Sequence, residues 1–288
     1  MSWNGAAPPE PPPPGLLGRL RLVLRTGAAA LWLAGMFGIF LVARGVDLAA
    51  RALGIGSWRA LAPWVVHFWA FGALALLGLR FRRVGEPMRH PGAVVANHAS
   101  WIDIVAMMRA MRIFFVSKAE VGGWPVIGGI GRAIGTMFID RRPVEARRQT
   151  EALHARLIRG DRLCIFPEGT STDGARVLPF KSALFEVLFA PDLRDRLWVQ
   201  PVSIVYRPAE GLPREIYAWW GDMDFAAHAA GLLALSEGGV VTVTFHPPLR
   251  AADFSDRKAL AAAAEAAVRG GWSETRRQEA ALEADFGG

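Results

Sequence analysis

Apolar residues are arranged differently near the amino terminus and in the rest of the chain. Two long stretches without Asp, Glu, Lys or Arg run from Gly27 to Ala43 and from Ala60 to Leu79. The first stretch is at the short limit of about 17 residues for an α-helix that crosses a bilayer, and the second is longer. Two such helices joined by a short polar loop predict a membrane-associated helical hairpin within residues 16–83.

The pattern alone does not choose how deeply this hairpin enters the bilayer. Several glycines, together with Pro63 and His67, weaken both spans, so a hairpin that dips into one leaflet is as consistent as one that crosses. A basic flank before an apolar centre is also typical of a secretory signal, although the second apolar stretch argues against cleavage. Two buried core helices of a soluble protein are the remaining alternative.

Arginines flank both apolar stretches. Three precede the first stretch and three follow the second, namely Arg19, Arg21, Arg25, Arg80, Arg82 and Arg83. Because cytoplasmic flanks of membrane helices carry an excess of Lys and Arg, this arrangement places both ends of the hairpin in the cytoplasm. The connecting loop also carries arginines, so the bias is small.

From Val84 onward, short apolar runs alternate with helical stretches. We expect strands in Ala93–Ala96, Ile113–Val116, Met137–Ile139, Leu163–Phe166, Trp198–Val205, Ile216–Trp220 and Val240–Phe245. We expect helices near Ile102–Met111, Val121–Ile134, Val144–Arg159, Phe180–Phe189 and Phe225–Ser236. The early strands are continuously apolar, which is typical of strands covered on both faces. The alternation predicts an α/β fold with a largely parallel central sheet flanked by helices.

These patterns divide the chain into four parts. Residues 1–15 hold a proline run that cannot build a core and are expected to form a disordered tail. The hairpin of residues 16–83 comes next, followed by an α/β catalytic domain over 84–250. A charged, helical cap is expected over residues 251–288.

The composition favours a membrane partner over nucleic acid. The formal net charge is +7 and the sequence pI is near 10.6, while 52% of the residues are hydrophobic and 11 are tryptophan. Arginines beside apolar, Trp-containing segments suit the interface of an anionic bilayer better than a duplex. The single cysteine, Cys164, lies in an apolar run, so no disulfide framework is possible and a reducing compartment is favoured.

Three polar motifs follow predicted strands directly. They are Asn97-His98-Ala99-Ser100-Trp101-Ile102-Asp103, Gly135-Thr136-Met137-Phe138-Ile139-Asp140-Arg141 and Phe166-Pro167-Glu168-Gly169-Thr170-Ser171. Ligands of open α/β sheets bind outside the carboxyl ends of the strands, so one crevice is expected to collect all three motifs.

His98 and Asp103 are the candidate catalytic residues. Acyl transfer to an alcohol needs a base that removes the hydroxyl proton, and histidine can do this near neutral pH. A carboxylate on the other ring nitrogen fixes the tautomer and stabilises the imidazolium. Five residues of separation permit this contact only if His98 lies in a turn before a helix that contains Asp103. A structural alternative is that Ser100 and Asp103 form a capping box, which would only stabilise the helix start.

Together, the motifs resemble the glycerolipid acyltransferase family, which includes 1-acylglycerol-3-phosphate acyltransferases. The resemblance also includes Val199-x-Pro201-Val202 and covers roughly residues 84–250. It implies that His98 is the general base, that Asp103 orients it, and that no covalent acyl-enzyme forms. It also implies that Glu168, Gly169 and Thr170 position the acceptor and that Arg141 binds its head group, with a further basic residue at Lys118.

The resemblance further implies the reaction partners. The acceptor is a membrane lysolipid, and the donor is a fatty acyl thioester of acyl carrier protein or coenzyme A. No cofactor and no metal are expected. A family with this bilayer-bound substrate implies a location at the bacterial cytoplasmic (inner) membrane, with the catalytic domain facing the cytoplasm.

One position departs from the lysophosphatidate-specific pattern. Many such enzymes have arginine after Phe-Pro-Glu-Gly-Thr, where this chain has Ser171, and serine cannot supply the bidentate cation that suits a phosphate. The longer runs Phe166–Ser182, Lys118–Pro125 and Trp219–Asp224 resemble bacterial lyso-ornithine lipid acyltransferases, which acylate a hydroxyl on an amino-acid-linked fatty acid. Arg176 and Lys181 are nearby cations, so a phosphate acceptor stays open at this point.

Other functional classes fit less well. A serine hydrolase of the α/β type would need Gly-x-Ser-x-Gly at a strand-to-helix turn, and the sequence has none. Zinc chemistry would need clustered His and Cys ligands, which are also missing from the sequence. A non-catalytic membrane-binding module would explain the hairpin and the charge, but it leaves the three motifs without a reason.

Overall fold

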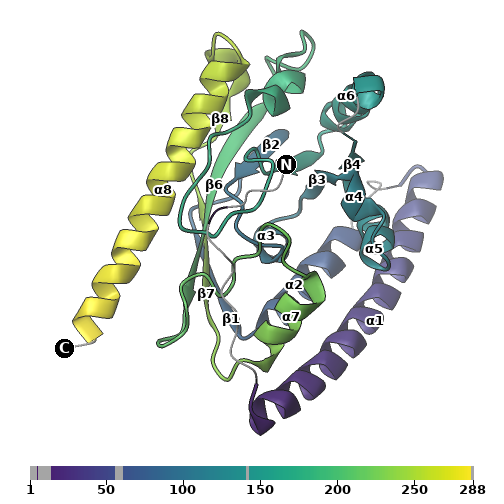
Figure 1. Cartoon of the computed structure of the whole chain (residues 1–288). Coiled ribbons are helices and arrows are strands. Elements are labelled where there is room, and N and C mark those ends of the chain that lie inside the picture. Colours follow the sequence, from purple (N-terminus) through teal and green to yellow (C-terminus); the bar gives the residue numbers. More distant parts are fainter. Residues whose placement is uncertain (1–4, 6–13, 56–60, 141–142, 287–288) are drawn as a thin grey trace.

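The computed structural model describes residues 5, 14–55, 61–140 and 143–286, so most of the proline-rich tail and Arg141 lie outside the described residues. Within these ranges, one eight-stranded sheet has the order β1-β7-β6-β2-β5-β3-β4, and β8 pairs with β6 (Figure 1). The strands are β1 (Leu79–Val84), β2 (Gly92–Ala96), β3 (Phe114–Lys118), β4 (Met137–Ile139), β5 (Arg162–Ile165), β6 (Trp198–Pro208), β7 (Gly239–Phe245) and β8 (Leu249–Arg250).

The sheet has a parallel half (β2, β5, β3 and β4) and a mixed half (β1, β7, β8 and β6), and β6 pairs with β2 where the two halves meet. Strands β6, β2, β5, β3 and β4 are mutually parallel, whereas β7 and β8 run antiparallel to β6, and β1 runs parallel to β7. The sequence prediction of a largely parallel sheet is therefore confirmed for the strands that carry the polar motifs. Strand β7 starts at the end of the sheet where β6 finishes, because the connection through α7 does not cross to the other end. The two strands therefore run antiparallel.

Helices cover both faces of the sheet (Figure 1). They are α1 (Leu16–Ala52), α2 (Ala62–Leu76), α3 (Ile102–Ala110), α4 (Ala119–Gly122), α5 (Ile127–Ile134), α6 (Pro143–Ile158), α7 (Phe225–Ala234) and α8 (Arg257–Phe286), with the 3₁₀ helices η1 (Ser182–Phe189) and η2 (Ala251–Asp253). One core contains residues of α2, α3 and α7, and the other contains residues of η1 and α8.

Strand β2 shows why the early strands are continuously apolar. Val94 and Ala96 belong to the core beneath α2 and α3, whereas Ala93 and Val95 belong to the core beneath α8. Successive side chains of a strand point to opposite faces, so a strand with helices on both sides needs apolar residues at every position. This confirms the interpretation of the sequence pattern.

Helix α1 is the longest described element. It has 37 residues, which corresponds to about 55 Å, and it extends beyond the predicted apolar stretch in both directions. It is the one helix among the described residues that is long and apolar enough to cross a membrane, and only 11% of its most apolar window is buried. Large apolar side chains are exposed along it, including Leu31 at 78%.

Helix α2 is held against α1 by a buried carboxylate. Both oxygens of Asp47 accept hydrogen bonds from the backbone N–H of Leu61, at 2.9 and 3.2 Å, and one also accepts from Ala62 at 3.0 Å. A negative charge at the start of a helix satisfies unpaired N–H groups and complements the helix dipole. Helix α2 ends at Leu76, before the end of the second apolar stretch, because Leu79 already belongs to β1 in the sheet.

Two sequence predictions of secondary structure are wrong. The run Ile216–Trp220 forms a turn and an irregular segment instead of a strand, because its backbone bonds to local groups and to the turn after β2. The predicted helix Val121–Ile134 is divided into α4 and α5 at Gly123-Trp124-Pro125. Proline removes a backbone donor and disfavours helix in the residue before it, which explains the break.

Candidate active site

The first motif forms the expected strand–turn–helix unit. His98 follows β2 in a turn, and Asp103 lies in the first turn of α3. The Nδ1 atom of His98 lies 2.8 Å from Oδ2 of Asp103. The Asp103 side chain is fully buried, whereas 18% of the His98 side chain is exposed. A buried carboxylate therefore holds an imidazole that still reaches the surface.

Asp103 accepts four hydrogen bonds. Besides His98, its Oδ2 atom accepts from the backbone N–H of Ala99 at 2.8 Å and of Ser100 at 2.9 Å. Its Oδ1 atom accepts from the hydroxyl of Tyr206 at 2.5 Å. The carboxylate thus closes the turn before α3 and contacts the imidazole at the same time, so this geometry is compatible with both the structural and the catalytic interpretation.

These contacts select one tautomer of His98. Both oxygens of Asp103 act as acceptors, so Nδ1 of the imidazole carries the proton and donates it. In the neutral ring the lone pair is then on Nε2, which is the arrangement of a general base. The ring also stacks on Phe166 with a centroid distance of 4.1 Å and an interplanar angle of 14°. Packing and hydrogen bonding therefore fix its orientation.

Glu168 joins the first motif to the third. Its Oε1 atom accepts from the backbone N–H of His98 at 2.7 Å, and its Oε2 atom accepts from the N–H of Leu178 at 2.8 Å. Burial raises the pKa of Glu168 to about 8, although the two backbone donors act in the opposite direction. Both of its oxygens contact the protein, so in this structure Glu168 holds the two motif segments together.

The rest of the third motif wraps around the histidine turn. The N–H of Thr172 donates to the carbonyl of His98 at 3.0 Å. Gly169 has φ +71°, and a Cβ atom added there would lie 2.6 Å from Nζ of Lys181. The positive φ favours glycine at this position, and the end of the Lys181 side chain lies beside it. Thr170 is half-buried and Ser171 is buried in the same turn.

The structure describes only one of the two cations, Lys118 and Arg141, that were predicted to bind the head group. Lys118 is the last residue of β3 and pairs in register with Ile139 of β4, so it lies at the carboxyl edge of the parallel strands and is half-buried. Arg141 lies outside the described residues. Of the other nearby cations, Arg176 pairs with Asp173 at 3.2 Å, whereas Lys181 lies against the third motif.

Tyr206 was missed by the sequence interpretation. It lies on β6 and reaches Asp103 across 103 positions of the chain. Burial and the neighbouring charge of Asp103 raise the pKa of Tyr206 well above its usual value, so the phenol keeps its proton and can donate. No local pattern marks this residue, because it follows a mostly buried run of β6 and its partner Asp103 is distant in the sequence.

Cys164 does not contribute to this site. Cys164 is fully buried, and burial raises the pKa of its thiol, so it is not a reactive nucleophile. Across the part of the chain that the structure describes, no three His, Cys, Asp or Glu residues are grouped as a metal site. Asp224 caps α7, because its side chain accepts from the backbone N–H of Ala227 at 2.7 Å.

Comparison with known proteins identifies the family of this chain. A model of the Acyltransferase family matches residues 80–205. The chain is 46% identical over 276 residues to the lyso-ornithine lipid O-acyltransferase of Rhodobacter capsulatus, covering 96% of this chain and 98% of that protein. It is 34% identical over 265 residues to the enzyme of the same name from Pseudomonas aeruginosa, with 88% and 94% covered.

The fold also matches a solved structure. The crystal structure of the 1-acyl-sn-glycerophosphate acyltransferase PlsC from Thermotoga maritima superposes with a TM-score of 0.64 at 20% identity, covering 90% of this chain and 96% of that one. These findings decide against a non-catalytic membrane-binding module. Together with the apolar helix α1, they indicate a membrane protein. This chain therefore belongs to the acyltransferase family and is a lysolipid O-acyltransferase.

Proposed function

We propose that the acceptor is a lyso-ornithine lipid and that the donor is a fatty acyl thioester of acyl carrier protein or coenzyme A. The near-complete coverage of the Rhodobacter capsulatus relative supports this acceptor. The serine at position 171 supports it as well, since the arginine that many lysophosphatidate enzymes carry there, which binds a phosphate bidentately, is replaced by an uncharged side chain. The reaction takes place at the cytoplasmic face of the inner membrane, and no cofactor takes part.

His98 acts as the general base in this proposal. Its Nε2 atom removes the proton of the acceptor hydroxyl while the hydroxyl oxygen attacks the thioester carbonyl carbon. The C–S bond then breaks, and the proton passes from the imidazolium to the leaving thiolate. The observation that carries the assignment is the 2.8 Å contact between Nδ1 of His98 and Oδ2 of Asp103 beneath an exposed imidazole edge.

Asp103 and Tyr206 act behind the histidine. Asp103 stabilises the imidazolium and fixes its tautomer. Tyr206 is a positioning residue, because its hydroxyl contacts the oxygen of Asp103 that does not touch the imidazole. Glu168 joins the histidine turn to the third motif, so that Gly169, Thr170 and Ser171 form one wall of the acceptor site.

Cations at the same edge of the sheet bind the acceptor head group. Lys118 lies at the carboxyl end of β3, and Arg141 follows β4 in the sequence. Lys181 lies beside Gly169 in the third motif and supplies a point charge for the carboxylate of the amino acid. This set replaces the arginine that many lysophosphatidate enzymes carry after Phe-Pro-Glu-Gly-Thr.

One reconstitution tests the proposal. The full chain in proteoliposomes is supplied with labelled acyl carrier protein or coenzyme A thioesters and with either lyso-ornithine lipid or lysophosphatidate. We expect labelled ornithine lipid as the main product. Phosphatidate as the main product would overturn the acceptor assignment, and no product with any pair would overturn the proposed acceptor and donors together.

A further inference from the structure

The connection between α4 and α5 contains an unusual backbone conformation. Val126 has φ +64°, and it is the only non-glycine among the described residues with positive φ. The N–H of Ile127 donates to the carbonyl of Pro125 at 2.6 Å, which closes a three-residue γ-turn centred on Val126. This turn is rare and strained, and a β-branched residue is among the least suited to it.

The side chain of Val126 makes few packing contacts with the rest of the protein. It is 68% exposed, so packing does not offset the strain. Glycine would relieve the strain, and glycines occupy neighbouring positions of the same segment, namely Gly122, Gly123, Gly128, Gly129 and Gly131. Persistent strain at an exposed position points to a function outside the fold of the monomer.

The base of this connection is rigid. The guanidinium of Arg132 donates to the carbonyl of Gly122 at 2.7 Å. A Cβ atom on Gly128 would lie 2.1 Å from the same carbonyl oxygen, so the two short helices touch backbone to backbone. The apolar tip formed by Trp124, Pro125, Val126 and Ile127 therefore projects from a fixed base.

The apolar tip also contacts the active site. The ring of Trp124 packs edge-on against Trp219 at 6.2 Å and lies 6.0 Å from Phe225. The backbone N–H of Trp219 donates to the carbonyl of Ala99, the neighbour of His98, at 2.8 Å. The tip and the catalytic turn are thus two sides of one aromatic cluster.

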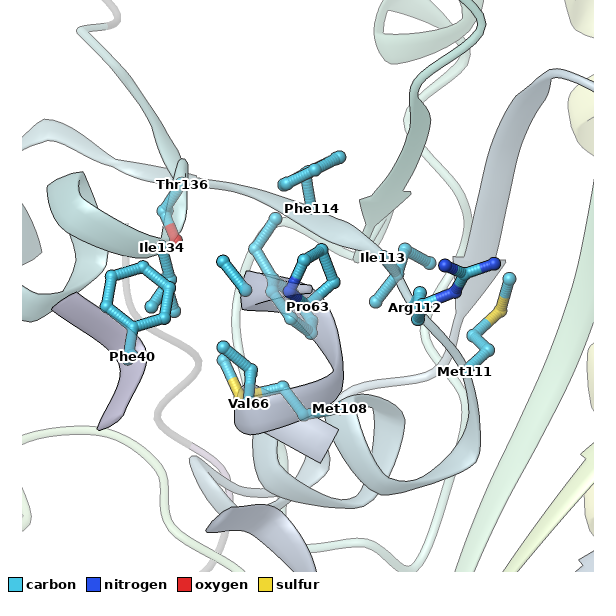
Figure 2. A pocket seen from close by; sticks show the side chains of 12 residues that line it. Phe40, Pro63, Val66, Met108, Met111, Arg112, Ile113, Phe114, Ile134 and Thr136 are labelled. Atoms are coloured by element: carbon cyan, nitrogen blue, oxygen red, sulfur yellow. The ribbon is translucent and has the colours of Figure 1, made fainter. Parts of the chain in front are cut away.

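On its other side, the apolar tip continues into the exposed apolar hairpin. Ala133 and Ile134 of α5 pack against Phe40 of α1 and Ala62 of α2. Figure 2 shows side chains of these elements around an open, mostly apolar pocket whose empty space, including the part open to solvent, is about 420 Å³. No charged residue occurs between Glu120 and Arg132 in the sequence.

We infer that the apolar tip inserts into the lipid bilayer beside α1 and α2 and holds the entrance of the His98 site at the membrane surface. A bilayer is the occupant that fits, because the neighbouring helix α1 exposes large apolar side chains and is long and apolar enough to cross a membrane. Tryptophan beside an uncharged apolar tip is the composition of a membrane interface. The acceptor then reaches His98 without leaving the bilayer.

Site-directed spin labelling tests the inference without any substrate. Cys164 is fully buried, so single cysteines can be labelled in the otherwise unchanged full chain in proteoliposomes. We compare Val126→Cys with Leu31→Cys on the exposed face of α1 and with Ala266→Cys on the exposed side of α8, which lies across the sheet from the hairpin (Figure 1). Collisions with oxygen report lipid, and collisions with a water-soluble nickel chelate report solvent.

The expected result is that the label at Val126 behaves like the label at Leu31, with oxygen favoured over the chelate. A label that behaves like that at Ala266 would overturn the inference. A label shielded from both reagents would also overturn it, because a protein partner or a second copy would then cover the tip. These outcomes do not depend on which lysolipid the enzyme acylates.

A rate measurement adds a matched pair. Val126→Asp and Val126→Asn have nearly the same size, and both residues tolerate positive φ better than valine. We expect Val126→Asp to turn over vesicle-embedded acceptor about tenfold more slowly than Val126→Asn, because a carboxylate resists transfer into lipid. Equal rates for the two variants would contradict bilayer insertion.

Discussion

The two halves of the sheet contribute to the active site in different ways. The parallel half, β2 with β5, β3 and β4, carries His98, Glu168 and Lys118 at or just after the carboxyl ends of its strands. The mixed half contributes Tyr206 from β6, whose hydroxyl bonds to the carboxylate behind the histidine. The reactive groups are thus encoded in short segments, whereas their support comes from a distant strand. The predictions below separate these two contributions.

The largest effect is expected in the parallel half. His98→Ala removes the base, and acyl transfer should fall by about a hundredfold or more. The protein should stay folded and membrane-bound, because the imidazole lies at the surface of the site. His154→Ala is the control, since His154 is a half-exposed histidine on α6 that pairs with Asp192. Near-normal activity of His98→Ala would remove the assigned mechanism.

A smaller effect is expected in the mixed half. Tyr206→Phe removes the hydrogen bond to Oδ1 of Asp103, and we expect kcat to fall about tenfold, because a hydrogen bond to a charged group contributes about 1.5–3 kcal/mol. KM should change little, since Tyr206 does not touch substrate in the proposed site.

Tyr217→Phe is a matched control for Tyr206→Phe. The two tyrosine rings are neighbours at 5.7 Å, but the buried hydroxyl of Tyr217 has no hydrogen-bond partner in the described part of the chain. Its removal should leave both the rate and the pH profile unchanged. Equal losses in the two variants would show that Tyr206 acts only through packing.

The pH dependence of folding stability tests the role of Glu168 in joining the two motifs. The native carboxyl keeps its proton up to about pH 8, whereas the unfolded chain loses it near 4.5. Between these values the native state binds more protons, so the contribution of Glu168 to stability is full at low pH and is lost as pH rises. In Glu168→Gln the loss of stability with rising pH that Glu168 causes should disappear. Thermal unfolding of the variant and of the wild type in detergent, at several pH values, measures this loss.

The same variant should also lower stability overall. Glutamine would place an amide N–H₂ group against one of the two backbone donors, at His98 or at Leu178. A lost bond to a buried group costs about 1–3 kcal/mol. An identical pH slope in Glu168→Gln and in the wild type would contradict the raised pKa.

The smallest effect is expected at Lys181, beside the third motif. Lys181→Met should raise the KM for lyso-ornithine lipid about fivefold with little change in kcat, because an exposed ion pair contributes about 1 kcal/mol or less. Lys181→Arg keeps the charge and should restore most of the affinity. Initial rates at varied acceptor concentration measure both variants. A fall in kcat alone would show that Lys181 does not bind the head group.

The sequence predicted elements well where the signal is local. Apolar runs located β2, β5, β6 and β7, and the spacing of His98 and Asp103 required a turn that the structure contains. The prediction was wrong at Ile216–Trp220, where aromatic and β-branched residues resemble a strand. There, Tyr217 is buried in the core and Trp219 bonds to Ala99, so tertiary contacts replaced strand pairing.

By itself, the sequence identified the candidate groups: a histidine and a carboxylate on one strand–turn–helix unit, a glycine-containing turn after β5, and an apolar amino-terminal segment. These features follow from spacing and periodicity, which act over a few residues. Only the tertiary structure decided that Tyr206 supports Asp103, that Glu168 joins two motifs, and that Val126 is held in a strained, exposed turn. Such contacts depend on which strands become neighbours, and that choice is made by burial on both faces of the whole sheet.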